Sequence, residues 1–198
     1  RINVTQYPDE ADGPGFRAYT DCNVLIDGSD VVHVTWPATY WQANQVSDQL
    51  GIRYANRIFT WDDVNQVERT VHDSNWDQEY CSPGAWNMQA CKPQLSECNG
   101  RLYVIFVQYN DAPAGRLDDC AYWGASTEIG GPGLEQGAAN GDLYVAISAD
   151  GGVTWDKARN TTATSTPLCG VGAEVTAGYC DAENWPSMAS FGSDAAGS

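Results

Sequence analysis

A polar turn followed by a short apolar strand occurs twice in this chain, and this repetition constrains the fold more than any other feature of the sequence. The turn at residues 27–30 leads into the apolar run 31–36, and the turn at residues 97–101 leads into the run 102–107. Elsewhere, apolar residues alternate or form short runs rich in Val, Ile, Tyr and Trp, and helical periodicity is nearly absent. This pattern predicts an all-β chain. The clearest predicted strands cover residues 31–36, 52–59, 102–108 and 143–148.

Each apolar run is followed by a second strand, a tight turn and a third, polar strand, near residues 66–71 and 157–162. The segment Pro93-Gln-Leu-Ser96 precedes the second run, and a similar segment, Pro186-Ser-Met-Ala189, occurs later in the chain. We therefore expect a repeated four-stranded antiparallel unit. Such units are typical of the blades of a β-propeller, and a two-sheet β-sandwich is the alternative. The expected blades cover about residues 22–71 and 93–162, with the start of a third at 186–198.

A ring of blades needs more material than this chain holds. Propellers close with roughly 4–8 blades, whereas only two blades and the start of a third are expected here. The sequence therefore predicts a fragment of a single propeller domain. The missing blades would come from the rest of a longer chain or from other subunits.

One short motif points to a family of propellers. Residues 148–155 read Ser-Ala-Asp-Gly-Gly-Val-Thr-Trp and match the pattern S-x-D-x-G-x-T-W. Through this motif the chain resembles the Asp-box (BNR repeat) sialidase-like β-propellers. A degenerate counterpart occurs around Thr60-Trp-Asp-Asp63. The fixed positions of the motif are Ser148, Asp150, Gly152, Thr154 and Trp155.

The resemblance implies that the Asp-box is a structural turn between the third and fourth strands of a blade, far from the ligand-binding face. We expect the carboxylate of Asp150 to accept hydrogen bonds from backbone N–H groups of its own turn. Gly151 and Gly152 supply the backbone freedom that the turn needs. Trp155 is expected to open the next strand and to pack its ring on the sheet.

The charge balance excludes some partners. The chain of 198 residues has 26 acidic and 10 basic side chains and a net charge of -16, so nucleic acids and anionic membranes are disfavoured. No apolar run approaches the ~20 residues that membrane insertion needs. Clustered carboxylates favour Ca²⁺, and Asp111, Asp118 and Asp119 are the candidate ligands, although a solvated acidic surface is the simpler interpretation.

Seven cysteines indicate disulfides rather than a zinc site, because none forms a C-x-x-C pair. Disulfides form in oxidising compartments, so we expect a secreted, cell-surface or periplasmic protein. Local pairing leaves Cys22 as the odd cysteine. The expected pairs are Cys169 with Cys180, Cys81 with Cys91, and Cys98 with Cys120.

The long connections of the expected blades fall on one face, the face on which sialidases bind substrate. They cover roughly residues 37–50, 73–92, 111–140 and 163–185. Sugar rings stack on aromatic side chains, so aromatic residues in these connections are candidate ligand contacts. Packing beneath the loops is the alternative role for these rings. The candidates are Trp36, Tyr40, Trp41, Tyr122 and Trp123.

These observations leave three functions open. The leading hypothesis is an extracellular propeller that binds a carbohydrate or an extracellular protein through its loop face. A sialidase-like glycoside hydrolase is the second, and a structural surface or filament subunit is the third. The family resemblance implies three arginines on the substrate carboxylate, a Tyr–Glu nucleophile pair and an Asp acid/base. Only Arg17, in Phe16-Arg-Ala-Tyr19, matches one of these positions, and that segment lacks the proline of the family motif.

Overall fold

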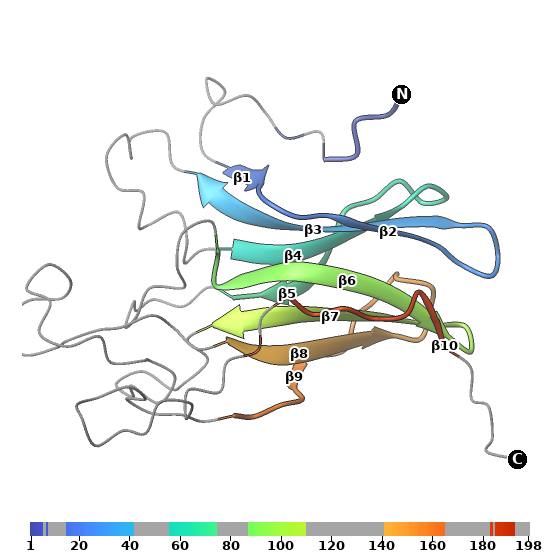
Figure 1. Ribbon diagram of the computed structural model, residues 1–198. Coiled ribbons are helices and arrows are strands. Elements are labelled where there is room, and N and C mark those ends of the chain that lie inside the picture. The colour runs from blue at the N-terminus through green and yellow to red at the C-terminus, as the bar shows by residue number, and fades with distance from the viewer. Residues whose placement is uncertain are drawn as a thin grey trace, which may run out of the picture.

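The protein is all-β, as the sequence pattern predicts. The computed structural model describes residues 1–5, 7, 15–41, 56–74, 87–109, 141–164, 183 and 185–192. Within these residues there is no helix, and so none that could cross a membrane. The strands are β1 (Gly15–Ala18), β2 (Asn23–Ile26), β3 (Val32–Trp41), β4 (Asn56–Asp62), β5 (Arg69–Asp73), β6 (Ala90–Cys98), β7 (Arg101–Tyr109), β8 (Gly141–Ser148), β9 (Arg159–Asn160) and β10 (Phe191–Gly192) (Figure 1).

The strands form two sheets of five, and apart from β10 the strands of each sheet follow chain order. In the first sheet β3, β4 and β5 pair antiparallel in succession, and β1 and β2 lie end to end along the free edge of β3. In the second sheet β6, β7, β8 and β9 pair antiparallel, and β10 pairs parallel with β6. Each sheet therefore contains four successive antiparallel positions, with the first position of the first sheet divided between β1 and β2.

The predicted connection at residues 37–50 starts too early, and the gap between β1 and β2 along the edge of β3 explains why. The connection expected at residues 37–50 begins as strand, because β3 continues to Trp41. Pro37 lies inside β3 and has no N–H to donate. The Pro37 carbonyl accepts from the Tyr19 N–H at 3.1 Å, and Tyr19 lies in the segment between β1 and β2. The backbone nitrogen of Pro37 faces the same side of β3, where no strand is paired with it. The ladder is already interrupted there, and the proline costs it no hydrogen bond.

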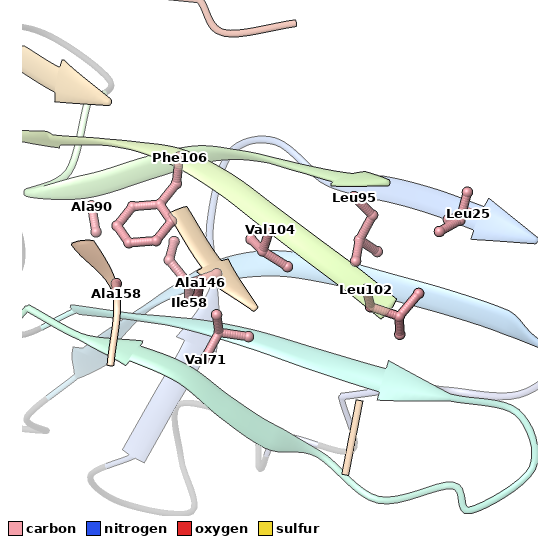
Figure 2. Packing of buried hydrophobic residues seen from close by; sticks show 10 residues of the cluster. All are labelled: Leu25, Ile58, Val71, Ala90, Leu95, Leu102, Val104, Phe106, Ala146 and Ala158. Carbon is pink, nitrogen blue, oxygen red and sulfur yellow. The ribbon is translucent and has the colours of Figure 1, made fainter. Parts of the chain in front are cut away.

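The main core lies between the two sheets (Figure 2). Residues of the first sheet meet a larger set of residues from the second, and all of them are buried. Apolar faces of two sheets that pack in this way are the main stabilising term of a small all-β protein. The first sheet contributes Leu25, Ile58 and Val71, and the second contributes Ala90, Leu95, Leu102, Val104, Phe106, Ala146 and Ala158.

Four turns lie at one end of the strands, here called the turn end, at the right of Figure 1. They connect β2 to β3, β4 to β5, β6 to β7 and β8 to β9. The Asp-box turn between β8 and β9 lies there. Asp150 accepts from the backbone N–H of Thr154 at 2.9 Å and from the Thr154 hydroxyl at 2.6 Å. The Ser148 hydroxyl donates to Asp150 at 2.8 Å and accepts from the Gly152 N–H. Gly151 (φ 69°) and Gly152 (φ 88°) adopt left-handed conformations that other residues rarely reach.

Trp155 links the Asp-box turn to the other sheet. Its ring packs against the main core, and its Nε1–H donates to the Thr60 hydroxyl of β4 at 3.2 Å. The strand that follows the turn begins only at Arg159, so Trp155 precedes this strand rather than opening it. The motif therefore orders its own turn and also connects the two sheets.

The Asp150 contacts predict an acid-sensitive contribution to stability. The Thr154 hydroxyl, then the Thr154 N–H and the Ser148 hydroxyl, lower the pKa of Asp150 to about 2, below its usual value of about 3.9. A lowered pKa stabilises the fold above the unfolded-state pKa, and this gain is lost as pH falls through about 2. We expect Asp150→Asn to lower the melting temperature at pH 7, with a difference that shrinks between about pH 4 and pH 2.

Thermal unfolding followed by circular dichroism at several pH values measures this difference. Asp156→Asn is the matched control, because Asp156 is an exposed aspartate next to the same turn. A melting temperature of Asp150→Asn equal to that of the wild type at pH 7 would contradict the prediction.

Three residues other than glycine adopt a left-handed backbone conformation in or near β2, β6 and β10. Asp21 (φ 59°) stands two residues before β2, and Lys92 (φ 56°) lies at the bulge of β6. Trp185 (φ 60°) stands six residues before β10. Such conformations cost roughly 1–3 kcal/mol each and persist where the surroundings fix them. Pro93 and Pro186 follow the second and third of these residues.

Strands β2 and β10 also both lie beside β6. Asn23 of β2 bonds to the Gln94 side chain at 3.1 Å and the Leu95 N–H at 3.0 Å of β6, and the Gly28 N–H donates to Glu97 at 2.6 Å. Later residues of one segment thus meet later residues of the other, so β2 and β6 run in the same direction. β10 pairs parallel with β6 as well.

The cysteines differ from the prediction. Cys22, Cys91 and Cys98 have free thiols, so the Cys81–Cys91 and Cys98–Cys120 disulfides are not formed in the structure. Cys91 is fully buried and packs with Met88, Val107 and Tyr109, where a free cysteine serves as a small apolar side chain. Their expected partners, and the pair Cys169–Cys180, lie outside the described residues.

Candidate functional site

The end of the sheets opposite the turns, here called the loop end, is where β3, β5, β7 and β9 finish and β4, β6 and β8 begin. Tyr40 lies there, partly buried, with its ring edge-on to Phe16 at 5.3 Å. Trp41 ends β3 at the same end, but its side chain lies outside the described residues, as do Tyr122 and Trp123. Asp150 and Trp155 belong to the turn end.

Trp36 is wrong as a ligand contact. Its side chain is only 3% exposed and packs on the outer face of the first sheet with Phe59 and Trp61. The N-terminal segment covers this face, and the Trp36 Nε1–H donates to the Tyr7 hydroxyl at 3.1 Å. No ligand can stack on a ring that the chain itself encloses.

The arginines at the loop end of the first sheet are engaged within the chain. Arg17 lies on β1, partly buried, and its Nη1 donates to the Phe16 carbonyl at 2.9 Å. Arg57 pairs with Asp73 at 2.7 Å and lies 4.7 Å from the centroid of the Phe16 ring. These contacts orient both arginine side chains within the first sheet.

Two carboxylates come together at the loop end of the second sheet. Asp142 is the second residue of β8 and is buried, whereas Glu183 is half-buried. The Thr164 hydroxyl lies 2.6 Å from Asp142 and 2.9 Å from Glu183. The Thr162 hydroxyl lies 3.2 Å and 3.3 Å from the same two groups. Each hydroxyl has one proton and donates to one carboxylate at a time, so two protons serve both acids.

The two acids differ in how well they are bonded. Asp142 also accepts from the Asn160 amide at 2.6 Å and from the Thr164 N–H at 3.1 Å. Within the described part of the chain, the bonds to the Glu183 carboxylate are those of the two hydroxyls, and they reach one oxygen, Oε2. Asp142 is therefore held as a fixed acceptor, and Glu183 keeps an oxygen that can bond to a ligand.

An exposed aromatic ring stands two residues after Glu183. Trp185 is 71% exposed, and the ammonium group of Lys92 lies 4.0 Å from its ring centroid. Lys92 is itself buried, at 5% exposure. A cation placed over an indole ring is attracted by it, and this interaction is worth roughly 0.5–2 kcal/mol. The contact fixes the orientation of an otherwise solvent-exposed ring.

Residues near the two carboxylates and near the Trp185 ring pack around the same side chain, Val107. A Cβ at Gly141 would lie 2.6 Å from Val107 and 2.7 Å from the Glu183 carbonyl, so only glycine lets the segment of Glu183 approach β8. Cys91, next to Lys92, packs against Val107 in the same cluster. Burial raises the pKa of this thiol to about 11, and the nearby charge of Asp21 raises it further while Lys92 lowers it. Asp21 therefore lies close to this part of the loop end.

The sequence pattern did not predict Asp142, Glu183, Thr162, Thr164 and Lys92 as site residues. Trp185 belongs to the predicted connection 163–185, whose aromatic residues are candidate ligand contacts. One signal for Lys92 was present, because Lys92 and Trp185 both precede a proline, Pro93 and Pro186. For the acids there was no signal, because 26 acidic residues offer too many pairs.

The candidate calcium ligands Asp111, Asp118 and Asp119 lie outside the described residues. Within the described ranges, no group of three or more His, Cys, Asp or Glu side chains is arranged to hold a metal ion. Among known protein families, no family model matches the chain. Among curated proteins, no sequence matches it.

Proposed function

We propose that this chain is part of an extracellular Asp-box β-propeller that binds a glycan through its loop end. Three observations support a propeller over a sandwich. Apart from β10, the strands of both sheets follow chain order, with four successive antiparallel positions each. The first strands β2, β6 and β10 run in one direction, with β6 bonded to both others. Left-handed residues recur near all three of them.

The exposed ring of Trp185 is the observation that carries glycan binding. Tryptophan is enriched at binding interfaces, and a sugar ring can place its C–H groups against such a face. Lys92 holds the ring in place before any ligand arrives, so little conformational entropy is lost on binding. The free oxygen of Glu183, two residues away, can accept a hydrogen bond from a sugar hydroxyl.

The test is a glycan array followed by titration of the best ligand. We expect Trp185→Ala to weaken binding about 5- to 150-fold, the equivalent of roughly 1–3 kcal/mol for one lost stacking contact. Phe191→Ala is the matched control, because Phe191 is an aromatic residue of the same segment, 58% exposed, and lies toward the turn end. We expect this variant to bind like the wild type.

Equal affinities of Trp185→Ala and the wild type would remove the platform from the binding site. If the ligand is a protein instead of a glycan, the wild type will bind none of the sugars on the array.

A second candidate function is glycoside hydrolysis, and the Asp142–Glu183 pair favours it. Glycosidases use two carboxylates, one as proton donor and one as base or nucleophile. Asp142 and Glu183 share the hydroxyl groups of Thr162 and Thr164 and are the candidate pair. Incubation with fluorogenic glycosides tests this candidate. Release of the fluorophore by the wild type and its loss in Glu183→Gln would support hydrolysis, and no release by the wild type would exclude it for those substrates.

A further inference from the structure

We infer that the Trp185 platform selects uncharged glycans and discriminates against sialylated or otherwise anionic ones. This inference rests on the proposed glycan binding and adds the chemical class of the ligand. The inference depends on the charged groups in the neighbourhood of the Trp185 ring.

The only described cation at the platform is shielded from a ligand. The ammonium group of Lys92 lies over the Trp185 ring at 4.0 Å, and Lys92 is buried. A ligand that stacks on the exposed face of the indole therefore has the ring between itself and the ammonium group. Lys92 orients the platform and does not offer a direct ion pair to a ligand carboxylate.

The other charged groups near the platform are acidic. Glu183 is two residues from Trp185, and Asp142 shares two hydroxyl groups with Glu183. Asp21 is exposed and lies near Cys91, the neighbour of Lys92. Arg57, on the adjoining sheet, is already paired with Asp73 at 2.7 Å. The described part of the chain thus has three carboxylates in the neighbourhood of Trp185 and Lys92, and the chain as a whole has a net charge of -16.

This arrangement suits a ligand that donates hydrogen bonds. A neutral sugar has hydroxyl groups that can donate to Glu183 while its C–H face stacks on the indole. A ligand carboxylate cannot donate, and it meets repulsion from acidic groups that is only partly screened by salt. The local charge therefore opposes the sialic acid preference that the family resemblance implies.

The experiment compares matched pairs of glycans. Each oligosaccharide is presented as the neutral form and as the same form capped with sialic acid, and dissociation constants are measured at low and at physiological salt. We expect the capped form to bind about tenfold more weakly at low salt, with a smaller difference at higher salt, because the effect is electrostatic. Trp185→Ala should weaken both forms.

Two charge-neutralising variants make the test specific. Asp21→Asn suits the left-handed conformation at that position, and Glu183→Gln keeps the shape of the side chain. We expect the double variant to narrow the gap between neutral and capped glycans to about threefold or less. Equal or tighter binding of the capped form by the wild type would overturn the inference alone. Failure of the wild type to bind any glycan would overturn the proposed function and this inference with it.

Discussion

Replacement of Phe106 by alanine will lower the free energy of unfolding by about 3–5 kcal/mol. Phe106 is fully buried at the centre of the contact between the sheets, as Figure 2 shows. Its ring stacks on Tyr144 of its own sheet with a centroid separation of 5.8 Å, and on His72 of the other sheet at 4.8 Å. The smaller side chain leaves a cavity that two stiff sheets cannot fill. Urea denaturation followed by circular dichroism measures the loss.

Two further variants decide whether the loss comes from the inter-sheet contact. Phe106→Leu keeps most of the volume and should cost less than alanine. Phe191→Ala removes an aromatic ring that is 58% exposed and should change stability by no more than about 0.5 kcal/mol. Similar losses for Phe106→Ala and Phe191→Ala would mean that the sheets do not pack as described.

The second large effect is expected at Asn56, where the sheets are joined by hydrogen bonds. Its amide donates to the Ala90 carbonyl at 2.6 Å and accepts from the Ala90 N–H at 3.1 Å, and the Ser74 hydroxyl also donates to it. Asn56 is fully buried. Asn56→Ala leaves the polar backbone groups of Ala90 without partners, and we expect a loss of about 2–4 kcal/mol.

Asn23→Ala is the matched control for Asn56→Ala. Asn23 joins the same two sheets through Gln94 and Leu95, but it is only partly buried, so water can replace its bonds. We expect a loss of about 1 kcal/mol or less. If chemical denaturation gives the two variants the same stability, burial is not what makes the Asn56 bonds important.

The sequence predicts the strands well where both faces of a strand are packed. β7 and β8 lie close to the predicted ranges 102–108 and 143–148, because their β-branched and aromatic residues alternate between the two sheet faces. β1 was not predicted. It has only four residues, and it pairs with residues 38–41 of β3, which follow Pro37 in the same strand. Only the break between β1 and β2 makes that proline compatible with a strand.

His72 shows a similar limit of sequence reasoning. It lies near the end of β5, yet it is partly buried against Phe106 and bonds to Gln108 at 3.0 Å. Burial lowers the pKa of this imidazole, and the bond to Gln108 offsets part of the shift. Its strand end is buried because the next sheet packs over it, and a pattern within one strand does not contain that information.

The candidate site could be predicted only in part for the same physical reason. The sequence predicts aromatic and acidic residues at the loop end, and most of the predicted residues lie outside the described residues. The side chains that meet there come from segments far apart in sequence. Trp185 contacts Lys92, and Glu183 is linked to Asp142 through the Thr162 hydroxyl. Trp36 was misassigned because the segment that covers it, around Tyr7, precedes it by many residues.

The buried thiol of Cys91 makes the second sheet observable without denaturant. Alkylating reagents attack the thiolate, and Cys91 is enclosed, with a pKa raised to about 11 chiefly by burial. Its modification must therefore wait until β6 separates from β7. Cys22 is exposed and reacts without such an opening. The ratio of the two alkylation rates in one sample thus reports how often this sheet opens in the native protein.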